Sequence, residues 1–343
     1  MLIGNIGVGG GFPCFIMAEI SCSHNGSLAL ARKLVEVAAW AGADAVKFQT
    51  YRPGCLAVDS PHKAHRLASG PWAGKRLWDI YQEAMTPWEW LPELFALATH
   101  LGLVPLTSVS SLEGLQYVET TVDPLAYKIP SADVTDLDLV RAIANTGKPV
   151  ILSDGMTRPD QLKSALEVLA GQAILLRCVS EYPASPESYR LGVIRPLAKT
   201  SVPIGISDHT TDYTVAVASV ALGAQVIEKH LMLMPGDYET DPLDVGHSVD
   251  PRQFAHMVRA VRKVERSLAA VPRLGVEDGV GTGFRRRLVF ASDLEEGAVV
   301  GPDSIRSARC SQGLEPDAAE HVIGRTVLEA VRYGDPVTKE VVG

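Results

Sequence analysis

Two lysines and a set of serines stand at the ends of short apolar runs, where their side chains could bind an anion. The lysines are Lys47 and Lys128, and the serines are Ser108, Ser131, Ser153, Ser180 and Ser207. Ammonium groups and hydroxyl donors neutralise phosphate and carboxylate groups in a partly desolvated cleft. These residues therefore predict a pocket for a substrate that carries both a phosphate and a carboxylate.

Two other interpretations of the lysines remain open. Each lysine could form a buried ion pair with Glu19 or Glu228, which also stand at the ends of apolar runs. Alternatively, one of them could form a Schiff base with a carbonyl substrate, which requires a pKa lowered by burial or by cationic neighbours. The second alternative predicts a lysine aldolase that uses pyruvate, and borohydride trapping would reveal it.

Two histidines, His209 and His230, follow two successive apolar runs, so their imidazoles could approach one another closely. Such a pair could hold a divalent ion such as manganese, with water and substrate oxygens completing the set of ligands. The alternative is one histidine that forms hydrogen bonds in the core and one that contacts a substrate. Spacing alone leaves both interpretations open.

Eight apolar, β-branched runs alternate with helical segments, and these elements must position the polar side chains. The expected strands lie near residues 15–20, 45–49, 103–107, 125–129, 149–153, 173–178, 203–206 and 225–229. The clearest expected helices cover residues 27–41, 86–100 (with Thr86 as N-cap), 136–145 and 211–222. The alternation predicts a parallel sheet, and eight repeats predict a closed (β/α)8 TIM barrel. Active sites of such barrels lie at the C-terminal ends of the strands, where the lysines, serines and histidines stand.

The pattern changes near residue 270, and this change divides the chain. We expect a barrel domain over residues 1–270, a linker rich in Pro and Gly over 271–283, and a small β-rich domain over 284–343. Within the barrel, residues 53–75 form a long connection without apolar periodicity. Long loops in compact domains are typically functional, so we expect this one to lie at the mouth of the barrel.

Composition excludes several classes of function. The net charge of −8 argues against a protein that mainly binds nucleic acid or anionic membrane. No apolar run approaches the roughly 20 residues of a membrane span, and the N-terminus lacks the pattern of a signal peptide. The five cysteines are widely spaced and predict neither a disulfide framework nor a zinc knuckle. We therefore expect a cytoplasmic protein.

Six segments of the chain resemble the nonulosonic (sialic) acid synthase family. They are AEISCSHNGS (18–27), GADAVKFQTY (42–51), YKIPSADVTD (127–136), TGKPVILSDGM (146–156), PIGISDHT (203–210) and ALGAQVIEKH (221–230). The stretch GPWAGKRLWDIYQEAMTPWEW (70–90) is most similar to the pseudaminic acid synthase branch. Residues 284–343 resemble the antifreeze-like (SAF) lid domain of these synthases, so the resemblance covers nearly the whole chain.

The resemblance implies an enzyme that condenses phosphoenolpyruvate with the aldehyde of a 2-acetamido or 2,4-diacetamido sugar. The products would be a nonulosonic, sialic-acid-like acid and phosphate, the phosphate being released by C–O cleavage. His209 and His230 would hold the divalent metal of the reaction. We expect Mn²⁺ in this position, with Mg²⁺ and Co²⁺ as alternatives.

The same resemblance implies roles for individual residues. Lys47 and Lys128 would hold the phosphate and carboxylate of phosphoenolpyruvate together with Ser108, Ser131, Ser153 and Ser207. Glu19 and Asp244 would contact the sugar, and Asp133 would orient and deprotonate the attacking water. Arg309 would reach into the active site of a neighbouring subunit, which implies a domain-swapped homodimer whose linker spans to the partner.

Several positions depart from the family pattern, and most of them would face the sugar. Ser23 stands in place of the usual Asn, Asp133 in place of Glu, and Val245 in place of the His of neuraminate synthases. We therefore expect an unusual acceptor sugar rather than N-acetylmannosamine. A non-catalytic barrel that merely binds a sugar phosphate is the remaining rival, but the intact set of lysines and histidines argues against it.

Overall fold

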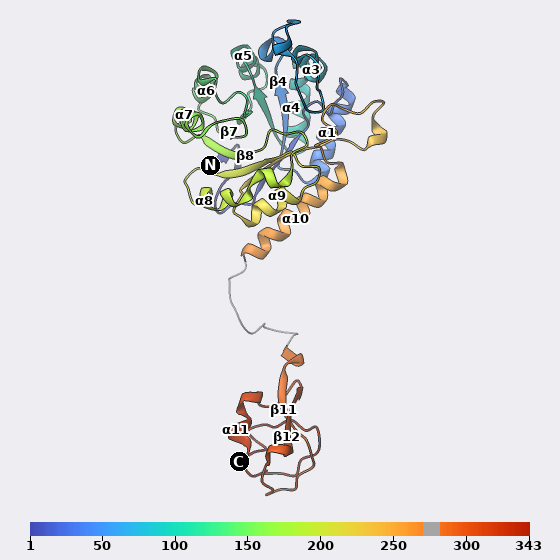
Figure 1. Cartoon of the computed structure of the whole chain (residues 1–343), viewed down its shortest axis with the longest axis vertical. Helices are drawn as coiled ribbons and strands as arrows, with labels where there is room; N and C mark the ends of the chain where they lie inside the picture. Colours follow the sequence, from blue (N-terminus) through green and yellow to red (C-terminus); the bar gives the residue numbers. More distant parts are fainter. Residues whose placement is uncertain (270–281) are drawn as a thin grey trace. The chain divides into compact units, whose positions relative to one another are not determined.

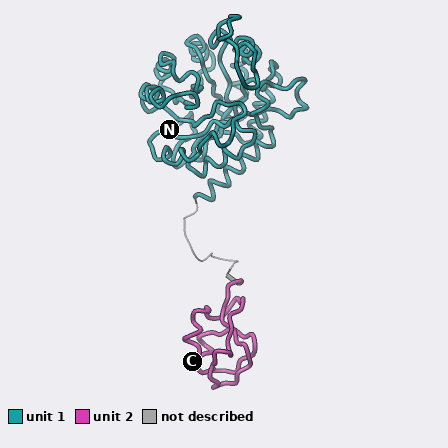
Figure 2. Tube along the Cα trace, viewed as in Figure 1, with its two compact units in different colours: residues 1–270 teal, residues 271–343 magenta. Residues whose placement is uncertain are grey.

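The computed structural model describes residues 1–269 and 282–343, and the chain forms two compact units (Figure 2). The units are Met1–Ala270 and Val271–Gly343. Most of the expected linker, residues 271–281, lies outside the described residues. Among the described helices, none is long and apolar enough to cross a membrane.

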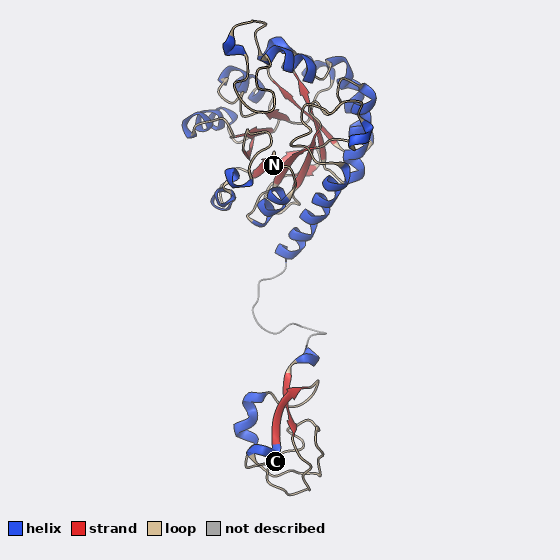
Figure 3. Ribbon diagram, turned by 45° about the vertical axis from the view of Figure 1, so that its right-hand side comes forward, coloured by secondary structure: helices blue, strands red, loops and turns tan. Residues whose placement is uncertain are grey.

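The first unit is a closed barrel of eight parallel strands with helices around it, which confirms the predicted TIM barrel (Figures 1 and 3). Strand β10 pairs with both β9 and β3, and this pairing closes the barrel. The strands are β3 (Phe15–Glu19), β4 (Ala45–Thr50), β5 (Val104–Val109), β6 (Tyr127–Ile129), β7 (Val150–Ser153), β8 (Ala173–Cys178), β9 (Ile204–Asp208) and β10 (Val226–His230).

Most of the helices of this unit cover the outer face of the barrel, and one, over Leu77–Ala84, lines the cavity described below. The helices are α1 (Leu28–Ala41), α2 (Pro53–Leu56), α3 (Leu77–Ala84), α4 (Leu91–His100), α5 (Leu112–Thr121), α6 (Leu137–Ala144), α7 (Pro159–Leu169), α8 (Ile194–Leu197), α9 (Thr214–Ala221) and α10 (Pro251–Ala269). Helix α1 begins where expected, because the hydroxyl of Ser27 accepts a hydrogen bond from the backbone N–H of Leu30. The expectation of Thr86 as N-cap was wrong. Residues Trp88–Trp90 form a 3₁₀ turn, α4 starts at Leu91, and the Thr86 hydroxyl bonds to His24 instead.

Alternate residues of each strand point into the barrel, because successive side chains of a strand lie on opposite faces. The lower interior is apolar. It is filled by Phe15, Met17, Ala45, Val104, Leu106, Ala126, Ile151, Ile174, Leu176 and Val226, with Ile3 and Val8 from the N-terminal segment that holds strands β1 (Leu2–Ile3) and β2 (Ile6–Gly7). Space is tight at Gly205, where an added Cβ would lie 2.3 Å from the carbonyl oxygen of Val226. The next inward positions on several strands are polar, which places a polar layer above an apolar floor.

The connection after β4 contains short ordered pieces rather than a structureless loop. Helix α2 and a 3₁₀ turn over Lys63–His65 interrupt it, and an isolated antiparallel bridge joins Arg66 to Arg76. The bridge closes a hairpin whose tip contains Trp72. Several residues of this hairpin line the cavity described below.

The second unit is small and built around an antiparallel pair of strands, as expected for residues 284–343. Strand β11 (Arg286–Phe290) pairs with β12 (Ile305–Arg309), and α11 (Ala319–Val322) is a single helical turn. An isolated antiparallel bridge also joins Val299 to Thr326. A separate apolar cluster stabilises this unit, formed by Leu288, Phe290, Val300, Ile305, Val322, Val327, Val331 and Val337.

Candidate active site

A cavity of about 700 Å³ opens at the C-terminal ends of the barrel strands. Nine of the residues predicted from the sequence line it: Lys47, Lys128, Ser131, Ser153, Ser180, Ser207, His209, His230 and Asp244. They come from β4, β6, β7, β8, β9 and β10 and from the segments that follow them. Closure of the barrel therefore brings together side chains that lie up to about two hundred residues apart in the sequence.

The two lysines line the cavity and also form ion pairs with glutamates, so the ion-pair interpretation is confirmed, while the anion-binding interpretation stays a prediction. Lys47 pairs with Glu19 and lies 3.8 Å from Glu228, while the Nζ of Lys128 lies 3.7 Å from the Glu228 carboxylate. All four side chains are buried. Two positive and two negative charges thus form one cluster at the floor of the cavity.

Burial shifts the pKa values of this cluster. Burial raises the pKa of Glu19 to about 7, although the nearby Lys47 opposes this shift. Burial also lowers the pKa of Lys128, although the attraction of Glu228 opposes it. For Glu228, burial favours a high pKa, but Lys128 and Lys47 outweigh it and hold the value at about 2. Glu19 is thus the member of the cluster that most readily takes up a proton, which would release Lys47 to bind an anion.

The serine hydroxyls lie around the lysines. The hydroxyls of Ser131 and Ser180 are 2.9 Å apart, and Ser207 donates to Glu228 over 2.7 Å. The hydroxyl of Ser153 is buried and has no hydrogen-bond partner among the described residues. A buried polar group without a partner is costly, so this hydroxyl fits an anion bound in the cavity. Ser108 is buried in β5 next to Lys128 of β6 and does not line the cavity.

The two predicted histidines lie side by side, with ring centroids 5.3 Å apart. The Nδ1 of His209 lies 2.7 Å from the carbonyl oxygen of Val179, and the Nδ1 of His230 lies 3.2 Å from the carboxylate of Asp244. Because both partners are acceptors, each Nδ1 carries the proton and each Nε2 keeps a free lone pair. Burial lowers the pKa of both rings to about 3, so both are neutral and able to bind a cation.

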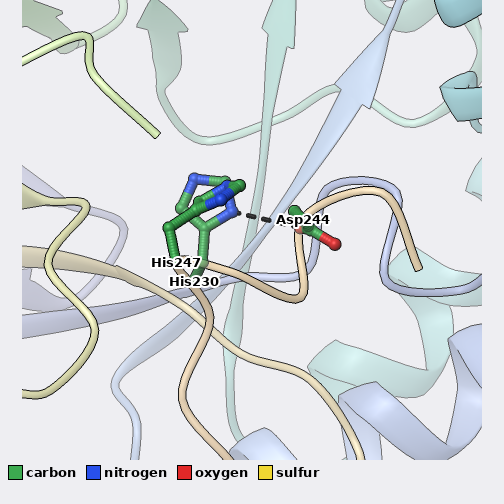
Figure 4. A group of neighbouring side chains, drawn as sticks. All are labelled: His230, Asp244 and His247. Carbon is green, nitrogen blue, oxygen red and sulfur yellow. Dashed lines mark hydrogen bonds and ion pairs between the residues drawn. The ribbon is translucent and has the colours of Figure 1, made fainter. Parts of the chain in front are cut away.

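A third histidine, His247, completes a group that could hold a metal ion (Figure 4). Each of His230, Asp244 and His247 offers one ligand atom, and these atoms lie within 4.8 Å of one another. The rings of His230 and His247 have centroids 4.6 Å apart. The donor set of imidazoles and a carboxylate fits a divalent transition metal. The sequence reasoning missed His247 because it considered only residues at the ends of strands, and the signal available was its three-residue spacing from Asp244.

Three predicted residues lie near the cavity without lining it. Glu19 is behind Lys47, where it accepts a hydrogen bond from the backbone N–H of Ser21. Asp133 accepts a hydrogen bond of 2.8 Å from Ser110, and burial raises its pKa. Ser108 is the third. Arg309 lies in the second unit, at an exposed end of β12. The roles predicted for these four residues stay predictions.

Two polar residues at the strand ends point away from the cavity. Asp208 directly follows the inward-facing Ser207, and Lys229 lies between the inward-facing Glu228 and His230. Both side chains therefore face outward, because successive side chains of a strand lie on opposite faces. Their charged atoms lie 3.3 Å apart, both side chains are fully buried, and Lys229 also donates to the carbonyl oxygen of Thr210. This pair is structural.

An aromatic and apolar wall faces the charged side of the cavity. Tyr182 packs against His209 with ring centroids 4.4 Å apart, and Trp72 from the hairpin lies 6.3 Å from Tyr182. Tyr51 and Tyr81 form a second aromatic pair, 5.6 Å apart. The remaining apolar lining residues of this region are Leu67, Leu77, Ile80, Ala84 and Leu243. The arrangement suits a substrate with an anionic part and an uncharged part with apolar groups.

A closed parallel barrel with a charged cavity at its strand ends defines a TIM-barrel enzyme that acts on an anionic substrate. A model of the NeuB family matches residues 34–272. Pseudaminic acid synthase of Campylobacter jejuni subsp. jejuni serotype O:2 is 34% identical over 328 residues, which cover 94% of each chain. Pseudaminic acid synthase of Helicobacter pylori is 32% identical over 335 residues, 96% of this chain and 97% of that protein.

Solved structures agree with this assignment. The N-acetylneuraminic acid synthetase of Leptospira borgpetersenii serovar Hardjo-bovis, crystallised with citrate, superposes with a TM-score of 0.70 at 26% identity, covering 81% of this chain and 92% of that one. The chain therefore belongs to the NeuB family. The family match and the named relatives confirm the resemblance found in the sequence, and with it the prediction of an enzyme that forms nonulosonic acids.

Proposed function

We propose that this enzyme condenses phosphoenolpyruvate with the aldehyde of a 2,4-diacetamido sugar, giving a nonulosonic acid and inorganic phosphate. The observation that carries the proposal is the cavity itself, in which two buried lysines and the unpartnered hydroxyl of Ser153 lie across from a cluster of histidines. The lysines and hydroxyls suit the phosphate and carboxylate of the donor. The histidines and Asp244 suit the aldehyde end of the acceptor.

In the proposed donor site, positively charged side chains neutralise the negative charges of phosphoenolpyruvate. Lys47 and Lys128 would bind the phosphate and carboxylate of phosphoenolpyruvate, with hydroxyl donors from Ser131, Ser153 and Ser180. Glu19 would take up a proton when the anion binds, which keeps the buried charges balanced. Glu228 would remain ionised and hold Lys128 and Ser207 in place.

Carbon–carbon bond formation joins C3 of phosphoenolpyruvate to the aldehyde carbon of the sugar, and the aldehyde oxygen takes up a proton to become a hydroxyl group. A divalent ion held by His209 and His230 would polarise the aldehyde carbonyl. Asp244 would hold His230 in the orientation that this requires, through the contact of 3.2 Å at Nδ1. Val179 does the same for His209 through its carbonyl oxygen.

Phosphate release follows from addition of water. Water adds to C2 of the former phosphoenolpyruvate and loses a proton, and the resulting tetrahedral intermediate collapses to a ketone as the C–O bond to phosphate breaks. Asp133 would accept the proton, because its raised pKa makes the carboxylate a better base than an exposed aspartate. Asp133 is held by Ser110 near the rim, at the end of the segment after β6.

The acceptor is proposed from the apolar wall of the cavity. Trp72, Tyr182, Tyr51 and Tyr81 offer surfaces that suit acetamido methyl groups. Both curated relatives described above are named for pseudaminic acid. We therefore expect a 2,4-diacetamido hexose to be a better acceptor than N-acetylmannosamine.

The test is phosphate release from phosphoenolpyruvate with Mn²⁺, Mg²⁺ or Co²⁺, against a panel of 2-acetamido and 2,4-diacetamido hexoses. We expect release that depends on one class of sugar, that stops with a chelator and that is lost in His230→Ala. Phosphoenolpyruvate labelled with ¹⁸O at the bridging position should yield labelled phosphate, because the C–O bond breaks. Label retained in the organic product would contradict the mechanism.

Three further observations distinguish the proposed reaction and acceptor from the alternatives. Treatment with pyruvate and borohydride should leave no adduct on Lys47 or Lys128, whereas a lysine aldolase would be trapped. Best turnover with N-acetylmannosamine would contradict the proposed acceptor but not the reaction. A folded protein that does not bind phosphoenolpyruvate would support the non-catalytic barrel.

The proposal also includes the oligomeric state of the enzyme. We expect a cytoplasmic, domain-swapped homodimer in which Arg309 of one subunit completes the site of the other. Arg309 is exposed at the end of β12, so it is available for such a contact.

A further inference from the structure

His247 lies in a segment that returns to the barrel mouth after β10. The backbone N–H groups of His247 and Ser248 both donate to the carbonyl oxygen of Asp244 over 3.2 Å. Val249 then forms a parallel bridge with Leu231, directly after His230. This single turn places Asp244 and His247, three residues apart, at the end of β10. Neither the motifs of the sequence nor the proposed reaction assigns a role to His247.

The position of His247 is that of a metal ligand. Its side chain is buried and lines the same cavity as His209 and His230. Its ring centroid lies 4.6 Å from that of His230 and 6.1 Å from that of His209. The three residues, hereafter the histidine cluster, lie side by side at the mouth of the barrel, and the ligand atoms of His230 and His247 lie within 4.8 Å of one another and of Asp244.

Each imidazole of the histidine cluster keeps a nitrogen that can bind a cation. His209 and His230 each use Nδ1 in a hydrogen bond, as described above. The Nε2 of His209 lies 3.4 Å from the hydroxyl of Ser207, but that hydroxyl donates to Glu228, so the lone pair on Nε2 can still bind a cation. Within residues 1–269 and 282–343, neither ring nitrogen of His247 has a hydrogen-bond partner. A neutral imidazole keeps a lone pair on one of its nitrogens, and His247 lines the cavity, so this nitrogen can bind a cation that enters there.

Asp244 orients the cluster and can also bind a metal. One of its carboxylate oxygens accepts from the hydroxyl of Ser23 over 3.0 Å, and the other accepts from Nδ1 of His230. Each oxygen keeps a further lone pair, and Asp244 belongs with His230 and His247 to the group of possible ligands. The other donor atoms of the cluster are imidazole nitrogens.

We propose that His247 is a third protein ligand of the metal, and that the three imidazoles select a transition metal such as Co²⁺ or Zn²⁺ over Mg²⁺. The inference rests on the proposed function for the presence of a metal at this place. Imidazole nitrogen suits Zn²⁺ and related ions, whereas Mg²⁺ prefers oxygen ligands and retains its water. Three protein ligands with one or more open positions are typical of catalytic metal sites, so the substrate oxygen still has room to bind.

The test measures metal binding without turnover. The metal-free full-length protein is titrated with Co²⁺ and with Mg²⁺ by isothermal titration calorimetry, for the wild type, His247→Ala and the control His256→Ala. His256 is an exposed histidine of α10. We expect His247→Ala to weaken Co²⁺ binding about tenfold or more, with little change for Mg²⁺, because alteration of a metal site commonly costs this much affinity. The visible spectrum of bound Co²⁺ should also change in His247→Ala and not in His256→Ala.

Equal Co²⁺ affinity and an unchanged Co²⁺ spectrum in His247→Ala would overturn the proposal, even if phosphoenolpyruvate condensation were established. Melting temperatures of the metal-free proteins show whether the variant folds. If the variant does not fold, the test is made by NMR on the wild-type protein labelled with ¹⁵N-histidine. On addition of Zn²⁺, the resonances of three of the nine imidazoles should shift to positions typical of metal-bound histidine. A shift of only two would overturn the third ligand while leaving the proposed function intact, and a shift of none would contradict both.

Discussion

At the scale of single residues, the site is a balance of buried charges. Lys47, Lys128, Glu19 and Glu228 compensate one another before any substrate is bound. A buried charge that loses its partner is costly, since the partner group remains in a medium of low polarity. If an anion binds to these lysines, we expect Glu19 to take up a proton, because burial raises its pKa to about 7.

Lys128→Met tests the role of this balance in donor binding. We expect kcat/KM for phosphoenolpyruvate to fall by at least roughly 30-fold, which corresponds to about 2 kcal/mol, because truncation of one partner of a buried charge pair costs 2–5 kcal/mol. The measurement is initial-rate kinetics of phosphate release with the best acceptor. Lys199→Met, at an exposed position, is the matched control and should behave as the wild type. An unaltered kcat/KM in Lys128→Met would remove Lys128 from the donor site.

At the scale of the elements, the two faces of a strand separate residues that line the cavity from residues that stabilise the fold. Inward positions near the strand ends carry Ser207, Glu228 and His230, and these line the cavity. The outward neighbours Asp208 and Lys229 form an ion pair beneath the helices. A shift of one residue in register would exchange these two sets, because side chains alternate along a strand.

The outward pair predicts an effect on stability. Lys229→Met should lower the free energy of unfolding of the barrel by about 3–5 kcal/mol, because it leaves Asp208 buried without its partner. The double variant Asp208→Asn, Lys229→Met should recover part of this loss. Tryptophan fluorescence during urea unfolding reports on the barrel alone, since all five tryptophans lie in the first unit: Trp40, Trp72, Trp78, Trp88 and Trp90.

An exposed ion pair provides the control for this experiment. Lys163 and Glu167 lie one helical turn apart on α7, 3.8 Å from each other, and both are exposed. Lys163→Met should change stability by no more than about 0.5 kcal/mol, because exposed pairs contribute little. If Lys229→Met were as mild as Lys163→Met, the assignment of Asp208 and Lys229 to a structural pair would be wrong.

At the scale of the whole molecule, the chain has two units with separate apolar cores. The barrel contains the lysines, serines and histidines of the site, whereas Arg309 belongs to the second unit. If Arg309 completes the site of a neighbouring subunit, two defective subunits should complement each other. One subunit carries Lys128→Met in its barrel, and the other carries Arg309→Ala.

Each homodimer should be nearly inactive, and the mixed sample should regain activity after subunit exchange. The intact barrel would then receive Arg309 from the Lys128→Met subunit. Phosphate release measured before and after exchange decides the matter, and size-exclusion chromatography with light scattering gives the oligomeric state. Activity that stays absent after proven exchange would place Arg309 in its own subunit's site, whereas an Arg309→Ala homodimer that is active by itself would place Arg309 in no site.

Much of the fold could be predicted from local sequence. The alternation of β-branched runs with helical segments is a local pattern, and the strand from Ala173 to Cys178 was located to the residue. The start of α4 was misplaced, because Thr86 bonds to His24, a residue 62 positions away. Such a contact has no local signal.

The sequence by itself determined the residue types at the strand ends, and with them the prediction of an anion site and of a pair of histidines. Only the tertiary structure decided the orientation and the partners of these side chains. It paired Lys47 and Lys128 with Glu19 and Glu228, and it turned Lys229 away from the cavity. It also brought His247 beside His230, because the segment after β10 folds back through a bridge between Val249 and Leu231. Closure of the barrel sets these distances, and closure depends on contacts between residues far apart in the chain.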